Sequence, residues 1–235
     1  MKCGVVVFPG SNCDHDCYHI LKHVFELDTE WIWHKDDVDL SGFDLIVLPG
    51  GYSYGDYLRA GAIAQFSSVM KKVIEFANSG RMVLGICNGF QVLVESGLLP
   101  GALIQNHTQK FVCKTVSIRV ESVSTPFSCE CVEKPVLEIP IAHHQGSYFI
   151  DSEGLDQLVD NQQVVFRYSG PDGEVTDQYN PNGSVDNIAG IVNKNKNVMG
   201  LMPHPERCAD PAWPNLDGQL IFKSIIYSLQ DGVSL

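Results

Sequence analysis

Cys87 is the residue of this 235-residue chain that is best placed for covalent chemistry. It lies between Gly85 and Gly89, where a continuous apolar run over residues 81–86 gives way to apolar residues at helical spacing. Glycines two positions before and after a nucleophile permit the sharp strand-to-helix turn that is known from hydrolases. A free cysteine is more often a small buried hydrophobe. The catalytic interpretation therefore depends on a partner elsewhere in the chain.

His204 and Glu206 are the candidate partners. They follow the apolar run 198–202 in a Pro-His-Pro-Glu sequence. Prolines favour an extended path, in which residues two apart project to the same side, so we expect Glu206 to orient His204. A cysteine nucleophile needs such an imidazole, because a free thiol with a pKa of about 8.5 is only a few per cent thiolate at pH 7. By itself, His-Pro-Glu at a strand end is more often a solvated turn. The catalytic interpretation becomes the stronger one only if the fold places these residues next to Cys87.

Attack on a carbonyl also requires hydrogen-bond donors for the oxyanion. In the strand-to-helix turn, the N–H of Asn88 is one donor. We expect the second from Gly51, next to Gly50 in a loop after another apolar run, because glycine lets the backbone approach a substrate closely. The alternative is an ordinary turn. Together these residues predict attack on an amide or ester carbonyl, formation of a thioester, and hydrolysis.

Alternating strand and helix patterns must position these residues. Apolar runs typical of buried strands alternate with helical spacing, and this pattern predicts an α/β fold with a doubly wound, mostly parallel sheet and flanking helices. Ligands bind at the carboxyl ends of strands in such sheets. The expected strands are 3–8, 30–34, 43–48, 82–87 and 198–202, and the expected helices are 14–27, 62–78 and 217–230, with another beginning at Asn88. Alternating segments at 112–120, 136–142, 164–168 and 188–192 predict antiparallel strands that extend or flank the sheet.

Composition narrows the possible partners. With 16 Lys and Arg against 28 Asp and Glu, the formal charge of −12 argues against nucleic acid or an anionic membrane surface as a partner. A hydrophobic content of 44% is ordinary for a globular protein. The first apolar run is too short for a secretory or membrane-spanning segment. We expect a single domain over residues 1–235 in the cytoplasm.

The eight cysteines predict neither a disulfide framework nor a metal site. A chain of this size without a secretory signal favours reduced thiols. The spacings Cys13-x-x-x-Cys17 and Cys129-x-Cys131 are not those of zinc knuckles, so we expect no metal and interpret Cys13 and Cys17 as packing residues one helical turn apart. A phosphate-binding loop is also missing, so any ATP chemistry belongs to a partner or to a fold that lacks this motif.

The motif at residues 85–91 (GICNGFQ) and the His-x-Glu pair resemble the class I glutamine amidotransferases. Within that class, the chain is similar along essentially its whole length to the glutaminase subunits of phosphoribosylformylglycinamidine synthases, which act in purine biosynthesis. The runs that carry this resemblance are 8–13 (FPGSNC), 48–61 (LPGGYSYGDYLRAG), 97–103 (GLLPGAL), 180–184 (NPNGS) and 202–207 (MPHPER).

The resemblance implies that Cys87 attacks the side-chain amide of L-glutamine, that His204 serves as general base and acid, and that Glu206 orients it. Gln91 matches the position that helps to hold the substrate, and independently of the resemblance we expect the glycine backbone at Gly50 to contact it. Ammonia would pass to a large synthetase subunit that uses ATP and Mg²⁺ to amidate formylglycinamide ribonucleotide, with a small accessory subunit in the same complex and no cofactor in this chain. One departure concerns Gln145, where the resemblance leads us to expect an acidic residue.

Three alternatives remain at the level of sequence. The first is a DJ-1-like cysteine peptidase or deglycase, in which histidine commonly follows the nucleophile, whereas Asn88 follows it here. The second is a glutaminase that serves another synthase, of guanylate, cytidylate or pyridoxal phosphate. The loop 52–61 and the turn 180–184 argue against it. The third is a non-catalytic scaffold, which the intact Cys, His and Glu disfavour.

Overall fold

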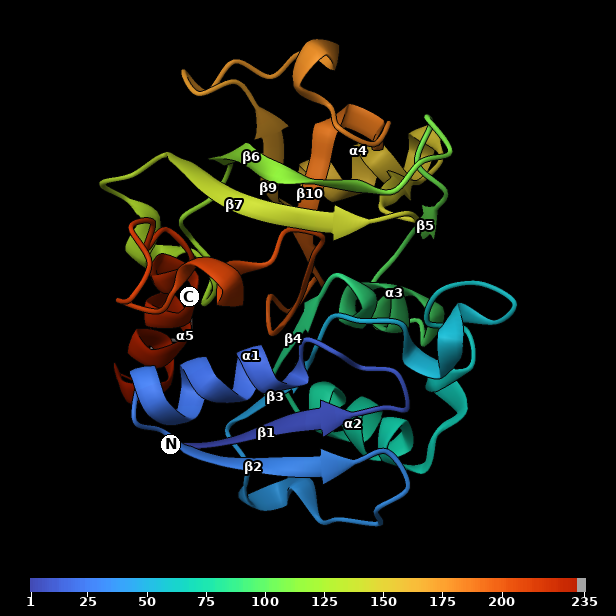
Figure 1. Ribbon diagram of the computed structural model, residues 1–235, viewed down its shortest axis with the longest axis vertical. Coiled ribbons are helices and arrows are strands. Elements are labelled where there is room, and N and C mark those ends of the chain that lie inside the picture. Colours follow the sequence, from blue (N-terminus) through green and yellow to red (C-terminus); the bar gives the residue numbers. More distant parts are fainter. Residues whose placement is uncertain (232–235) are drawn as a thin grey trace.

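A computed structural model describes residues 1–231 and is built on a nine-stranded mixed sheet (Figure 1). The strand order is β2-β1-β3-β4-β11-β10-β9-β6-β7. The bounds are β1 Lys2–Val7, β2 Asp28–Trp33, β3 Leu45–Leu48, β4 Met82–Ile86, β6 Val112–Val120, β7 Val136–His143, β9 Val164–Ser169, β10 Ile188–Val192 and β11 Val198–Leu201. Two further strands, β5 (Ala102–Ile104) and β8 (Ser147–Phe149), pair with each other in a small separate sheet.

The main sheet has a parallel and an antiparallel half. β2, β1, β3, β4 and β11 pair in parallel, whereas β10, β9, β6 and β7 join by antiparallel pairings. The predicted α/β sheet is therefore confirmed, and the antiparallel region continues it as one sheet. β3, β4 and β11 are buried along their whole length, as expected for central parallel strands that are covered on both faces.

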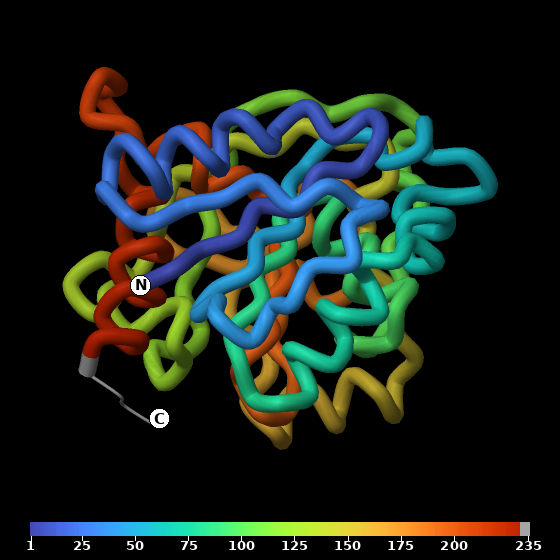
Figure 2. Tube along the Cα trace, turned by 90° about the horizontal axis from the view of Figure 1, so that it is seen from below, coloured from blue at the N-terminus to red at the C-terminus, as the bar shows by residue number. Residues whose placement is uncertain are grey.

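Five α-helices are present among the described residues: α1 Asp14–His19, α2 Ser68–Asn78, α3 Asn88–Glu95, α4 Ser152–Asp160 and α5 Gly218–Asp231. Helices α1 and α2 lie on opposite sides of the parallel strands (Figure 2). The helix expected over 14–27 is α-helical only at its start, because a π-helical turn follows at Ile20–Val24. The helix expected from residue 62 begins later, after a separate 3₁₀ turn at Ala64–Phe66.

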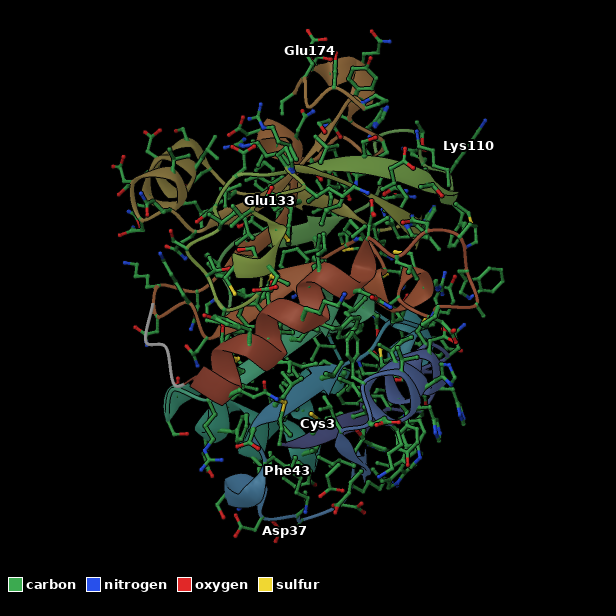
Figure 3. All side chains as sticks on the ribbon, turned by 90° about the vertical axis from the view of Figure 1, so that its left-hand side faces the viewer. Cys3, Asp37, Phe43, Lys110, Glu133 and Glu174 are labelled. Atoms are coloured by element: carbon green, nitrogen blue, oxygen red, sulfur yellow. The ribbon has the colours of Figure 1, made fainter. Side chains whose placement is uncertain are left out.

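The core fills the space between the sheet and its helices. Cys3 and Phe43 lie inside the molecule, whereas Asp37, Lys110 and Glu174 project from the surface (Figure 3). No described helix has the length and apolar character that crossing a membrane requires. The packing that matters most for the chemistry is that of α3 against β3 and β4, because the nucleophile precedes α3.

Gly89 sets how closely α3 approaches β3, and this contact predicts a stability effect. A Cβ at this position would lie 1.9 Å from the carbonyl oxygen of Leu48, which is backbone and cannot turn away. We expect Gly89→Ala to lower the free energy of unfolding by about 3 kcal/mol, the upper part of the range for overpacking. Urea unfolding measures this. Gly42→Ala is the matched control, because a Cβ there meets nothing within 4 Å; equal stability of the two variants would contradict the prediction.

Candidate active site

The expected turn at Cys87 is present between β4 and α3. Its backbone has φ 50° and ψ −103°, a sparsely populated conformation for a residue with a side chain. Two hydrogen bonds hold it there: the N–H of Cys87 donates to the carbonyl of Leu201 (2.8 Å), and the N–H of Gln91 donates to the carbonyl of Cys87 (3.2 Å). The side chain is 5% exposed. Strain of this kind presents the sulfur at the carboxyl end of the sheet.

His204 and Glu206 follow β11, which pairs in parallel with β4 and brings Leu201 opposite Ile86. Nδ1 of His204 and Oε1 of Glu206 are 2.6 Å apart, and both side chains are buried. The sequence prediction of an extended path between them is wrong. A 3₁₀ turn begins at Pro205 and runs to Cys208, and the carboxylate reaches the imidazole around this turn.

The electrostatics of the pair favour a protonated imidazole. Burial lowers the pKa of His204, but the charge of Glu206 and the nearby thiols of Cys87 and Cys13 outweigh this and hold the pKa well above its ordinary value. Within the described residues, Nε2 of His204 and Oε2 of Glu206 have no hydrogen-bond partner. Nε2 is therefore free for proton exchange with the Cys87 sulfur and with a substrate.

Cys87 opens into a cavity of about 330 Å³. The cavity is lined by residues 51, 52, 55 and 56 of the loop after β3, by Cys87 and Gln91, and by residues 142–145, which span the end of β7. The thiol of Cys87 lies 3.8 Å from the carbonyl oxygen of Ala142. This volume lies at the lower end of the range for small-molecule sites in proteins.

The structure places the two predicted oxyanion residues near the nucleophile. Asn88 is the first residue of α3, where backbone N–H groups lack intrahelical partners. Gly51 lines the cavity and has φ 136°, and a Cβ there would lie 2.6 Å from the nitrogen of Asn12. Gly50, which we expected to contact the substrate, lies against His204 instead. A Cβ on it would lie 2.8 Å from Cε1 of His204, so Gly50 packs against the imidazole and is not among the cavity-lining residues described. The chemical roles of all three stay predictions.

The side chain of Asn88 joins the loop 53–56 to helix α3, a feature that sequence reasoning missed. Its Oδ1 accepts from the N–H of Ser53 (3.0 Å), and its Nδ2 donates to Oε1 of Gln91 (2.8 Å) and to Oδ1 of Asp56 (3.2 Å). Gln91 in turn donates from Nε2 to the carbonyl of Gln145 (2.5 Å). Gln91, predicted to hold substrate, therefore lines the cavity while it fixes the loop after β7.

His143, the last residue of β7, is held in its neutral form. It is buried, and burial together with the charge of His204 lowers its pKa to about 4. Its Nδ1 lies 3.1 Å from Oδ1 of Asn106, and its Nε2 lies 3.4 Å from Nδ2 of Asn182. A neutral histidine held on both nitrogens shapes the cavity wall.

Cys13 lies close to His204 and Glu206. Besides packing, as the sequence predicted, it makes a hydrogen bond to a charged side chain. The Arg207 guanidinium donates to Sγ of Cys13 (2.9 Å), and Nε of Arg207 is 3.9 Å from Oε1 of Glu206. Cys13, His204 and Glu206 also form a group of possible metal ligands, with donor atoms within 4.8 Å of one another. The adjacent guanidinium opposes a cation there, and the His204–Glu206 hydrogen bond already occupies one possible ligand atom of each residue. Both observations argue against a metal at this group.

The comparisons with known proteins identify the family. The model of the CobB/CobQ-like glutamine amidotransferase domain matches residues 1–221. The "Phosphoribosylformylglycinamidine synthase subunit PurQ" of Moorella thermoacetica is 53% identical over 226 residues, covering 96% of this chain and 95% of that protein. The protein of the same name from Chlorobium chlorochromatii is 55% identical over 226 residues, with 96% of each chain covered.

Solved structures extend the likeness to the fold. A chain in the "Structure of PurLQS from Thermotoga maritima" matches with a TM-score of 0.84 and 42% identity, covering 97% of this chain and 98% of that one. Another glutamine amidotransferase from Thermotoga maritima matches with a TM-score of 0.57 but 14% identity, covering 98% and 92%, which shows the fold alone. In agreement with the resemblance of its motifs to class I enzymes, this chain belongs to the CobB/CobQ-like glutamine amidotransferase family.

Proposed function

We infer that this chain is the glutaminase subunit of a phosphoribosylformylglycinamidine synthase, working as a single domain that releases ammonia from L-glutamine. The observation that carries this function is the buried His204–Glu206 pair, in a chain that is 53% identical to a subunit of that name. The pair directly follows β11, which is the parallel neighbour of the strand that leads to Cys87. The family model disfavours a DJ-1-like peptidase or deglycase. The complete triad disfavours a non-catalytic scaffold.

The geometry supports the following reaction. The Cys87 sulfur attacks the amide carbon of glutamine, and the N–H groups of Asn88 and Gly51 stabilise the resulting oxyanion. The proton held by His204 passes to the amide nitrogen, which leaves as ammonia and creates a thioester. His204 then accepts a proton from water, which attacks the thioester and releases glutamate while Cys87 leaves as the thiolate. Glu206 orients the imidazole throughout.

We propose that the ammonia is used by a partner. The 42% identical relative from Thermotoga maritima was solved in an assembly named PurLQS, and by this likeness a large synthetase subunit binding ATP and Mg²⁺, with a small accessory subunit, would accept it. This chain would need no cofactor of its own. Exposed apolar side chains in the loop after Gly51 support contact with a partner: Tyr57 is 74%, Leu58 90% and Phe66 77% exposed. All eight cysteines are free thiols, which favours work in the cytoplasm.

The test is co-purification of the chain from its host, followed by an assay for glutamine-dependent amidation of formylglycinamide ribonucleotide. The proposed function predicts that the captured complex forms the amidine with ATP and glutamine. A complex that amidates guanylate, cytidylate or pyridoxal phosphate precursors instead would contradict it.

The exposed loop predicts that the isolated chain is a poor enzyme. Because Gly51 precedes a loop whose apolar side chains lack cover, we expect glutamate release by the chain alone to be at least roughly tenfold slower than in the complex, within the usual range of coupling between sites. A coupled glutamate dehydrogenase assay measures both rates. Equal rates would show that the oxyanion donors are already in place without a partner.

A further inference from the structure

Among the described residues that line the cavity with Cys87, Asp56 is the only carboxylate. This inference rests on the proposed function, under which the substrate is glutamine. Glutamine is a zwitterion, so a single carboxylate in the cavity can bind its positive end. Its α-carbon, which carries the ammonium group, lies three carbon–carbon bonds beyond the amide carbon that Cys87 attacks. We propose that Asp56 binds the α-ammonium of glutamine and thereby selects an α-amino acid over other primary amides.

The backbone around Asp56 is held in an unusual conformation. Tyr54, Gly55 and Asp56 have φ values of 54°, 69° and 53°, so three successive residues are left-handed. Such a run is strained for residues with side chains and persists only where surrounding contacts hold it. Here one contact is the donation from Nδ2 of Asn88 to Oδ1 of Asp56. The carboxylate of Asp56 is therefore hydrogen-bonded through Oδ1 to Asn88, the residue after the nucleophile. Its other oxygen, Oδ2, can accept a hydrogen bond from an ammonium group.

No cationic side chain in the described part of the chain pairs with the carboxylate of Asp56. Burial raises its pKa to about 6, the Asn88 amide opposes this rise, and no cationic side chain contributes. A half-buried carboxylate without a counter-ion gains most from a cation that arrives with the substrate. The other polar side chains that line the cavity carry no negative charge with which to bind an ammonium group. Gln145 is neutral, and its Oε1 already accepts from the N–H of Ala60 (3.3 Å).

The test compares two substrates in the complex of the chain with its synthetase. One is L-glutamine, and the other is 4-carbamoylbutyrate, which is glutamine without the α-ammonium. We expect Asp56→Asn to raise the KM for glutamine and lower its kcat/KM by roughly 10- to 100-fold, the range for one charge-assisted hydrogen bond. The kcat/KM for 4-carbamoylbutyrate should change by less than about threefold, because that substrate has no ammonium to lose.

A purely structural role for Asp56, acting through Asn88, has a different outcome. It would lower kcat/KM for both substrates equally and would slow alkylation of Cys87 by iodoacetamide. That result, or unchanged discrimination between the two substrates, would overturn the proposal. Asp37→Asn, at an exposed carboxylate on the surface (Figure 3), is the matched control and should leave both substrates unaffected. If the unaltered complex failed to hydrolyse glutamine at all, the proposed function would fail, and not only the role of Asp56.

Discussion

Cys87→Ser is expected to lower glutamine-dependent activity by on the order of 10⁴-fold, because loss of a nucleophile removes the covalent route and leaves only binding and the oxyanion donors. A serine hydroxyl is far less acidic than a thiol, so the buried His204–Glu206 pair can take up its proton far less readily. The measurement is glutamate release by the complex under saturating glutamine.

The same complex supplies the control. With ammonium chloride in place of glutamine, the Cys87→Ser complex should amidate its substrate within about twofold of the unaltered complex, because the synthetase site is untouched. Cys113→Ser, at an exposed cysteine, should leave both activities unchanged. Glutamine hydrolysis by Cys87→Ser at the native rate would refute the assignment of the nucleophile.

Glu206→Gln is expected to lower kcat by on the order of 10⁴-fold, in line with loss of the orienting carboxylate in other nucleophile–histidine enzymes. Burial alone would lower the pKa of His204, and the Glu206 charge is the main influence that raises it. Removing this charge lowers the pKa, so the imidazolium loses its proton at a lower pH. The remaining activity should therefore fall on the alkaline side at a lower pH than in the native enzyme.

Two measurements separate this electrostatic role from a structural one. The pH profile of glutamate release should narrow from its alkaline side. Iodoacetamide should also alkylate Cys87 more slowly at pH 7, because a less basic imidazole takes up the proton of the attacking thiol less readily. Glu133→Gln, at an exposed carboxylate, is the control and should change neither. An unshifted alkaline limb in Glu206→Gln would show that Glu206 does not set the protonation of His204.

Periodicity predicted the main elements because each strand of the sheet has its own apolar signal. β6 and β10 have the predicted bounds, since their alternating or apolar runs end at clear turns. The three-residue strands β5 and β8 were missed, because so short a run has no measurable period. Helix α4 was also missed, although a signal was present: Asp151 caps it by accepting from the N–H of Gly154.

The site was predictable where chemistry follows from neighbours in sequence. The elbow around Cys87 depends on glycines two residues away, and the His204–Glu206 pair is separated by one residue. Asp56 and Cys13 could not be assigned in this way, because their partners are distant in the chain. Asp56 accepts from a residue 32 positions away, and Cys13 accepts from one 194 positions away. Such contacts depend on how loops meet after the sheet has formed.

The strained backbone of Cys87 also places stability and activity in opposition during evolution. A side-chain residue held at φ 50° and ψ −103° costs roughly 1–3 kcal/mol, and glycine would recover much of that cost. Selection for thermal stability alone would therefore favour glycine at position 87. Only selection for turnover retains the cysteine. A lineage that no longer needs ammonia from glutamine should therefore replace Cys87 by glycine early, because this change makes the chain more stable.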